Sequence, residues 1–268
     1  MTAIALTIAG SDSGGGAGIQ ADLKTFSACG VYGASVITAL TAQNTLGVTG
    51  IHDVAADFVT SQMDAVFVDL DVDAVKIGML SQPAIIEAVA AGLVKHKAQS
   101  IVLDPVMVAE SGDPLLAQEA ESSLVNHLFP LADIITPNLH EAARLLDADM
   151  AQSHDDMAAQ AQALKELGAR AVLLKGGHSE ARTADDCFVD QSGSVVWFSA
   201  PFVKTRNTHG TGCSLSSAIA SGLALGADLE PAIDGAKRWL SRAIATADRL
   251  DIGSGAGPVH HFHEFWKN

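Results

Sequence analysis

The chain has 268 residues, of which 48% are hydrophobic and 24 are glycine, a composition typical of an α/β domain with many tight turns. Its formal net charge of -15 argues against a nucleic-acid partner, because no basic patch offsets repulsion by a phosphate backbone. Three widely separated cysteines favour reduced thiols and a cytoplasmic protein. Residues 1–10 read as a first strand, and no apolar run would span a membrane, so we expect neither a targeting peptide nor a membrane partner.

Short apolar runs alternate with segments of helical periodicity, which predicts a mostly parallel sheet with helices on both faces. Near the end of this series, residues 187–198 hold two β-rich pieces around the turn 191–194, which predicts an antiparallel hairpin at a sheet edge. A last long helix is expected over residues 229–250. No linker or repeat divides the sequence, so we expect a single domain over residues 1–268. The predicted parallel strands cover residues 5–9, 35–40, 74–77, 101–103, 133–136 and 171–174.

The first glycine-rich turn, residues 10–18, follows a predicted strand and opens a predicted helix. Backbone N–H groups in such a turn can approach an anionic ligand closely. A dinucleotide-binding turn would need an acidic residue after the next strand, which instead ends in Thr41-Ala42-Gln43-Asn44. No Gly-Lys-Ser/Thr follows the glycines, so the Walker A pattern is absent as well. A tight turn without a ligand remains an alternative.

The second glycine-rich turn, residues 207–214, also opens a predicted helix. Gly210 and Gly212 expose the backbone there, and the positive end of the helix suits the charge that develops on a phosphoryl group during transfer. Cys213 lies in the first turn of this helix, where the helix dipole favours a thiolate with a lowered pKa. The alternative is a small buried cysteine that only packs.

The segment Gly210-Thr211-Gly212-Cys213 resembles the anion-hole motif of the ribokinase-like superfamily, whose usual form has an aspartate as base in the place of Cys213. Cysteine in that place is similar to the hydroxymethylpyrimidine kinase branch of this superfamily. Further motifs of the branch match the chain in order and over nearly its whole length. They correspond here to residues 9–12, 18–25, 41–45, 76–80, 104–107, 136–142, 175–178 and 257–260.

The resemblance implies a three-layer α/β/α ribokinase-like fold with a mostly parallel central sheet and an antiparallel edge hairpin. It also implies an ATP- and Mg²⁺-dependent kinase of thiamine biosynthesis. Such an enzyme phosphorylates hydroxymethylpyrimidine to its monophosphate, and then the monophosphate to the diphosphate. The expected partners are therefore these small molecules, and the expected assembly is a homodimer.

Six residues carry over from the resemblance to the pyrimidine site. Gln43 would clamp the edge of the ring, since an amide both donates and accepts hydrogen bonds. Met79 and Val106 would form apolar walls. Asp22, Ala17 and Gly10 would border the same site. Without the resemblance, a glutamine after a strand is more often an exposed loop residue.

The resemblance assigns the remaining residues to phosphoryl transfer. Cys213 would accept or orient the hydroxyl proton, and Lys175 would neutralise the transferred phosphate. Asp104 and Glu141 would organise Mg²⁺ and its waters, although an acid in the first turn of a helix can simply complement its dipole. The residues expected to act in catalysis or to contact the nucleotide are Gly210, Gly212, Cys213, Lys175, Thr211, Asn207 and Asp104.

Two positions depart from the pattern of the branch. Gly14 stands where serine is frequent, and Glu110 stands where we expect a lysine that contacts phosphate. The histidines of residues 260–263 have no further ligand at metal spacing, so a packing segment is favoured over a zinc site.

Three other functions compete with the pyrimidine kinase. A pyridoxal or pyridoxine kinase shares the fold and also phosphorylates a hydroxymethyl group on a nitrogen heterocycle, and some relatives accept both rings. Gln43 with Met79 favours the pyrimidine. The other two are an oxidoreductase that binds a dinucleotide at the first turn, and a sensor that binds the pyrimidine without turnover.

Overall fold

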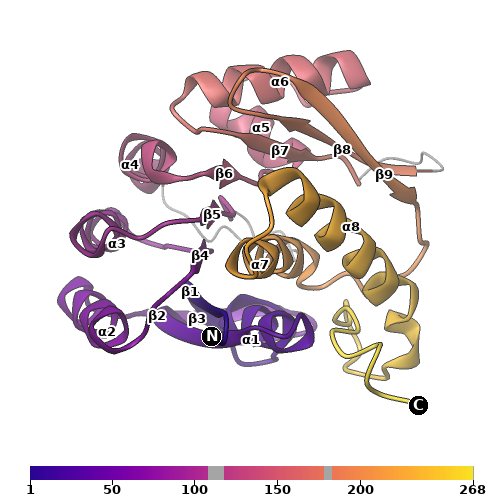
Figure 1. Ribbon diagram of the computed structural model, residues 1–268. Helices are drawn as coiled ribbons and strands as arrows, with labels where there is room; N and C mark the ends of the chain where they lie inside the picture. The colour runs from indigo at the N-terminus through magenta and orange to yellow at the C-terminus, as the bar shows by residue number, and fades with distance from the viewer. Residues whose placement is uncertain (108–117, 178–182, 268) are drawn as a thin grey trace.

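The computed structural model describes residues 1–107, 118–177 and 183–267, and there nine strands form one sheet in the order β3-β2-β1-β4-β5-β6-β7-β8-β9 (Figure 1). Neighbours from β2 to β7 run parallel. β3 is antiparallel to β2 at one edge, and β8 and β9 form an antiparallel hairpin at the other. The strands are β1 (Ile4–Asp12), β2 (Tyr32–Asn44), β3 (Gly47–Asp53), β4 (Ala74–Ile77), β5 (Ile101–Leu103), β6 (Ile134–Ile135), β7 (Val172–Lys175), β8 (Thr183–Val189) and β9 (Val195–Pro201).

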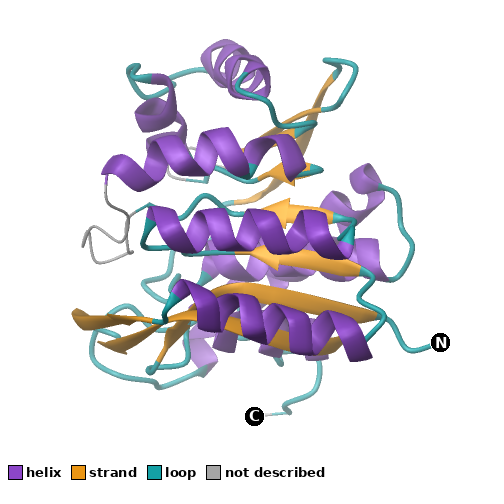
Figure 2. Ribbon diagram, turned by 90° about the vertical axis from the view of Figure 1, so that its left-hand side faces the viewer, coloured by secondary structure: helices purple, strands orange, loops and turns teal. Residues whose placement is uncertain are grey.

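Helices cover both faces of this sheet and give the molecule three layers (Figures 1 and 2). One core holds Phe26 and Ile219 beneath α1, α7 and α8. The other holds Met63 and Leu164 beneath the helices from α2 to α6. The expected α/β/α architecture is confirmed. The helices are α1 (Gly18–Ala28), α2 (Ala56–Asp69), α3 (Pro83–His96), α4 (Gln118–His127), α5 (Leu139–Leu146), α6 (His154–Glu166), α7 (Thr211–Ala224) and α8 (Leu229–Ala245), with short 3-10 helices at Phe129–Leu131 and Ala247–Arg249.

The central strands bury both of their faces, which explains their mostly apolar sequences. In β5, Ile101 and Leu103 enter one core while Val102 enters the other. Successive side chains of a strand point to opposite faces, so a strand between two helical layers needs apolar residues, or paired polar ones, at every position. This signal locates β4 and β5 with the bounds expected from the sequence.

Three elements differ from the expectation. β3 was not predicted, because most of its side chains are exposed and it joins the sheet mainly by backbone pairing with β2. β6 spans only Ile134–Ile135, which is shorter than the predicted run of residues 133–136. The last long helix ends at Ala245 and is followed by a 3-10 turn, so it stops before residue 250.

A buried ion pair joins the first core strands to both helices that begin at the glycine-rich turns. Lys76 of β4 and Asp22 of α1 are fully buried, and the Lys76 Nζ lies 2.9 Å from both carboxylate oxygens. The hydroxyls of Thr7 in β1 and Ser217 in α7 donate to the same carboxylate at 2.6 and 2.7 Å. Burial alone would lower the pKa of Lys76, but the carboxylate of Asp22 outweighs it and raises the pKa. Lys76 is therefore held as an ammonium.

We predict that Lys76→Met lowers the free energy of unfolding by about 3–5 kcal/mol, because it leaves the Asp22 carboxylate buried without its cation. Denaturant titration measures this loss. Lys95→Met is the control, since Lys95 forms an ion pair with Asp64 that is exposed to solvent, and we expect little change from it. Equal stability of the two variants would contradict the structural role assigned to Lys76.

Candidate active site

Several residues with side chains suited to binding or chemistry gather where the parallel strands end. Asp12 is the last residue of β1, Met79 lies two residues after β4, and Asp104 directly follows β5. Thr136 follows β6, and Lys175 ends β7. In open α/β sheets, ligands bind in the crevice outside the carboxyl ends of the strands. The candidate active site is this edge of the sheet.

The first glycine-rich turn folds around the carboxylate of Asp12. The N–H groups of Gly14, Gly16 and Ala17 donate to its oxygens at 2.8 to 2.9 Å, and the Gly15 N–H donates to its backbone carbonyl at 2.9 Å. The expectation that these backbone donors are free for a ligand is therefore wrong. Asp12, which sequence reasoning did not assign to the site, takes the position that a bound anion would have.

The second turn lies directly against the first. Gly210 precedes α7 with a φ of 81°, and a Cβ built on it would lie 1.9 Å from the carbonyl oxygen of Gly16. The backbone of Gly18 is close enough to Cys213 to act on the pKa of its thiol, so α1 and α7 begin side by side. The His209 Nε2 also lies 2.9 Å from the Asp12 carboxylate. The two glycine motifs, nearly 200 residues apart in sequence, thus form one structure.

We predict that Gly210→Ala lowers kcat by about 100-fold, because the added methyl group must push the two turns apart and shift the start of α7. Gly226→Ala is the matched control. Gly226 has a φ of 85°, close to that of Gly210, but no atom lies within 4 Å of its added Cβ. The Gly226→Ala variant should lose about 1 kcal/mol of stability through backbone strain and keep a normal kcat. Steady-state kinetics that find both variants equally active would refute the contact.

Lys175 and Asp104 meet beside the first turn of α7. The Lys175 Nζ lies 2.9 Å from the Asp104 carboxylate, to which Thr136 donates at 3.1 Å. A Cβ on Gly212 would lie 3.3 Å from the Lys175 Nζ, which places the ammonium next to the helix start. Burial would raise the pKa of Asp104, but Lys175 and Lys76 outweigh it and keep the pKa below its usual value. The structure therefore brings Lys175, Asp104 and Gly212 together as a charged cluster.

Glu141 lies close enough to this cluster to be affected by its charges. Its side chain accepts from the backbone N–H of Asn138 at 2.7 Å and completes a capping box at the start of α5. Burial raises its pKa to about 7, Lys175 opposes that rise, and Asp104 adds to it. Asp104 and Glu141 are thus two buried carboxylates. The positive charge near Glu141 is too small to keep it fully ionised at neutral pH.

These two carboxylates fit a magnesium ion that keeps most of its waters. Mg²⁺ is usually bound by one or two carboxylates together with substrate phosphates, and a bound cation would favour the ionised form of Glu141. Within residues 1–107, 118–177 and 183–267, no group of three or more histidine, cysteine, aspartate or glutamate side chains is arranged to hold a metal. A site supplied entirely by the protein is therefore not formed by the described residues.

Cys213 is half-buried in the first turn of α7. Burial raises the pKa of its thiol to about 11, although the ammonium of Lys76 acts in the opposite direction. The expectation that the helix start lowers this pKa is wrong for the ligand-free protein, because desolvation exceeds the effect of the helix end and of Lys76. Cys213 rests as a neutral thiol.

The residues assigned to the pyrimidine ring fall into two groups. Gly10, Ala17, Met79 and Gln43 lie around the first turn. The Met79 sulfur is 3.0 Å from a Cβ built on Gly10, and the Gln43 side chain accepts from Thr41 at 3.0 Å. Val106 is half-buried beyond β5, after Asp104. Asp22, in contrast, is fully buried in the ion pair with Lys76.

Asn207 and Thr211, expected at the nucleotide, make local contacts. The Asn207 Nδ2 donates to Asp248 at 2.8 Å, and its side chain packs against Gly257. The Thr211 hydroxyl donates to the carbonyl of Thr208. Their contacts with a nucleotide stay a prediction. Glu110 lies outside the described residues.

The C-terminal histidines pack beside the second turn. The Nε2 of His261 lies 3.0 Å from the hydroxyl of Ser214 in α7, and His260 is buried as well. Burial lowers the pKa of His261 to about 3, so its ring is neutral. At the first turn, a Cβ on Gly14 would lie 3.1 Å from the Asp12 carboxylate, so the frequent serine would fit there only with a small shift.

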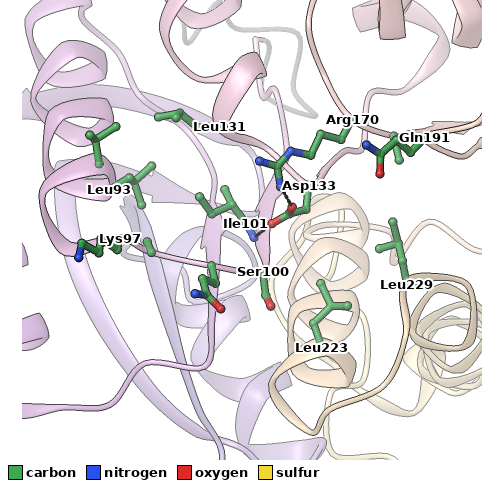
Figure 3. A pocket seen from close by; sticks show the side chains of 14 residues that line it. Leu93, Lys97, Ser100, Ile101, Leu131, Asp133, Arg170, Gln191, Leu223 and Leu229 are labelled. Carbon is green, nitrogen blue, oxygen red and sulfur yellow. Dashed lines mark hydrogen bonds and ion pairs between the residues drawn. The ribbon is translucent and has the colours of Figure 1, made fainter.

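A separate groove of about 670 Å³ lies at the opposite end of the sheet (Figure 3). It is lined by residues at the amino ends of β5 to β7, among them Ile101, Asp133 and Ala171. The Asp133 carboxylate pairs with Arg170 at 2.7 Å and accepts from the Ile101 N–H at 2.8 Å. The charges of Asp133 and Arg170 therefore bond to each other, away from Asp104 and Lys175.

The three-layer fold and the charged helix start at its strand ends are those expected of a small-molecule kinase of the ribokinase-like class. The family described as phosphomethylpyrimidine kinase matches residues 12–260. The chain belongs to this family.

Curated relatives agree over the full length. The chain is 59% identical over 268 residues, which is 100% of both chains, to the hydroxymethylpyrimidine/phosphomethylpyrimidine kinase of Rhizobium meliloti (strain 1021). It is 53% identical to the protein of that name from Salmonella typhimurium, over 98% of both chains. These two relatives therefore match this chain along nearly all of its residues.

Solved structures agree with the fold. A phosphomethylpyrimidine kinase from Clostridium difficile 630 superposes with a TM-score of 0.79 at 45% identity and covers 90% of this chain and 99% of its own. The ADP complex of Bacillus subtilis pyridoxal kinase has a TM-score of 0.90 at 36% identity, with 97% and 98% covered. No described helix is long and apolar enough to cross a bilayer.

Proposed function

We propose that this chain transfers the γ-phosphate of ATP to the hydroxymethyl group of hydroxymethylpyrimidine, and then phosphorylates the monophosphate to the diphosphate, in thiamine biosynthesis. The observation that carries this proposal is the contact between the two glycine-rich turns beside Lys175 and Asp104. The printed names of the full-length relatives support the substrate. The activity is that of a phosphotransferase in a single domain over residues 1–268.

The proposed step is an in-line transfer. The hydroxymethyl oxygen attacks the γ-phosphorus, the new O–P bond forms as the bond to the bridging oxygen of ADP breaks, and the hydroxyl gives up its proton. The backbone at Gly210 and Gly212 and the ammonium of Lys175 would stabilise the charge on the transferred group. Asp104 and Glu141 would hold Mg²⁺, which shields the phosphate charges when bound. Thr211 and Asn207 would contact the nucleotide.

Cys213 is the proposed acceptor of the hydroxyl proton. Its position one residue after Gly212 would bring the sulfur close to a phosphate transferred at the start of α7. The raised pKa of about 11 means that only a small fraction of the thiol is ionised at neutral pH. A largely dissociative transfer needs its base late in the reaction, so a weakly ionised thiol is compatible with turnover.

We predict that the wild-type rate of the chemical step rises with pH from about pH 7 to about pH 9.5, by close to tenfold per unit, because the thiolate fraction grows tenfold per unit below the pKa of about 11. Cys213→Ser should lose this rise, since a serine hydroxyl does not ionise in that range. Rapid-quench single turnovers measure the step. A flat wild-type profile, or full turnover by Cys213→Ala, would remove Cys213 from this role.

The ring pocket is proposed to consist of Gln43, Met79 and Val106, with Gly10 and Ala17 at its border. Gln43 is half-exposed, so its amide is accessible to a ring nitrogen and an exocyclic amino group. Asp22 could contact the ring only if its ion pair with Lys76 rearranged. In the ligand-free protein this pair stabilises the core. A second candidate is a pyridoxal or pyridoxine kinase, or an enzyme of both rings, which the similarity to a solved pyridoxal kinase favours.

The substrate is tested by incubation with Mg·ATP and hydroxymethylpyrimidine, its monophosphate or pyridoxine in parallel, with product masses as the readout. We expect a monophosphate and a diphosphate from the pyrimidine series and a much slower reaction with pyridoxine. Turnover of pyridoxine alone would refute the assignment of the pyrimidine as substrate. Binding of the pyrimidine without any product would favour the sensor instead.

We also propose that the chain forms a homodimer in the cytoplasm. Apolar side chains of Leu40, Ile51 and Phe58 are exposed on β2, β3 and α2, at one edge of the sheet, and support association. Sedimentation velocity distinguishes a dimer from a monomer. A monomer at micromolar concentration would contradict this part of the proposal.

A further inference from the structure

Asp12 and His209 form a buried polar pair to which the proposed reaction gives no role. The His209 Nε2 lies 2.9 Å from the Asp12 Oδ2, and the side chains are only 12% and 2% exposed. The same oxygen accepts the N–H groups of Gly16 at 2.9 Å and Ala17 at 2.8 Å. One carboxylate oxygen therefore joins the imidazole of the second turn to the backbone of the first.

The carboxylate of Asp12 is held in its charged form. Burial would raise its pKa, but the hydrogen bond from His209 and those from the backbone outweigh burial and lower the pKa below its usual value. Two titratable groups lie near the pair: Lys24, whose Nζ donates to the carbonyl of Gly15 at 2.6 Å, and His261, whose ring is neutral. The ionised carboxylate of Asp12 can accept the hydrogen bonds from His209 and from the backbone of the first turn at the same time.

The imidazole also fills the space between the turns. A Cβ built on Gly16 would lie 2.3 Å from the His209 Cδ2, so the ring packs on the backbone of the first turn. The backbone of His209 is fixed from the other side. Its N–H donates to the carbonyl of Gly257 at 3.0 Å, and its carbonyl accepts from Val259 at 3.3 Å. His209 therefore has little freedom to move on either side.

We propose that the Asp12–His209 pair is a positioning device that sets the separation between the first turn, which would border the acceptor, and the start of α7, which would face the transferred phosphate. The proposal rests on the function proposed above. Neither residue is placed on the reacting atoms, so both act through the turns that they join. Misplacement of reacting groups by about 1 Å can cost about 100-fold in rate, so loss of this pair should reduce kcat more than binding.

The test compares His209→Ala with His209→Gln. Glutamine carries an amide nitrogen that can reach the position of the imidazole Nε2 and donate to Asp12, whereas alanine removes the donor. We expect His209→Ala to lower kcat for hydroxymethylpyrimidine by about 30- to 100-fold with both KM values within about threefold of wild type. His209→Gln should recover most of that loss.

His261→Ala is the matched control. His261 is also a buried histidine bonded to the α7 side of the site, through Ser214, and its ring lies near Trp239 of α8, with the ring centroids 6.5 Å apart. It should lower the melting temperature about as much as His209→Ala and leave kcat unchanged. Asp12→Asn combined with His209→Ala should be no slower than the worse single variant, because the two residues act as one unit.

Hydrogen–deuterium exchange gives a readout that does not depend on catalysis. Exchange of the backbone N–H groups in residues 14–17 should accelerate in His209→Ala and stay at the wild-type rate in His261→Ala. The proposal is overturned if exchange there is unchanged, if kcat is unchanged while exchange accelerates, or if His209→Gln is as slow as His209→Ala. If wild-type protein turns over only pyridoxine, the proposed substrate fails and the same kcat ratios are measured with pyridoxine.

Discussion

The close approach of two backbones, at Gly16 and Gly210, is the constraint on which the rest of the site depends. No side chain fits between the Gly16 carbonyl and the Cα of residue 210, so the first turn and the start of α7 can meet only through glycine. Their meeting places the end of β1 beside the first turn of a helix that follows almost 200 residues later. The Asp12 carboxylate then stabilises the arrangement by collecting backbone donors that would otherwise be unsatisfied.

Local charge at the site differs from that of the whole chain. The protein has a net charge of -15, yet the buried Lys76 and the half-buried Lys175 lie beside the start of α7. Each ammonium is neutralised by a carboxylate in the ligand-free protein, Lys175 by Asp104 and Lys76 by Asp22. In the proposed reaction, the transferred phosphate would meet the ammonium of Lys175 already positioned and largely desolvated, which would strengthen the interaction.

Sequence reasoning found the features that local pattern controls. Strands such as β4 and β5 are buried on both faces, so their apolar runs carried a clear signal, whereas the exposed β3 carried none. The pairing of Asp12 with His209 joins residues 197 positions apart, and no local pattern predicts it.

The raised pKa of Cys213 was missed for another reason. The position of the residue at a helix start was visible in the sequence, but the degree of burial that outweighs the dipole was not. Likewise, the sequence shows Lys76 within a predicted strand, but it does not show that Asp22 is buried beside this lysine.

The central claim is that the transferred phosphate binds at the start of α7 and not within the first turn. A crystal structure with Mg²⁺, ADP, aluminium fluoride and hydroxymethylpyrimidine tests this most directly, because the fluoride complex mimics the phosphoryl group in flight. We predict that it contacts the backbone N–H groups of residues 210–213 and the ammonium of Lys175, with the hydroxymethyl oxygen on its other side. Density for the mimic at the N–H groups of residues 14–17, in place of the Asp12 carboxylate, would contradict the account.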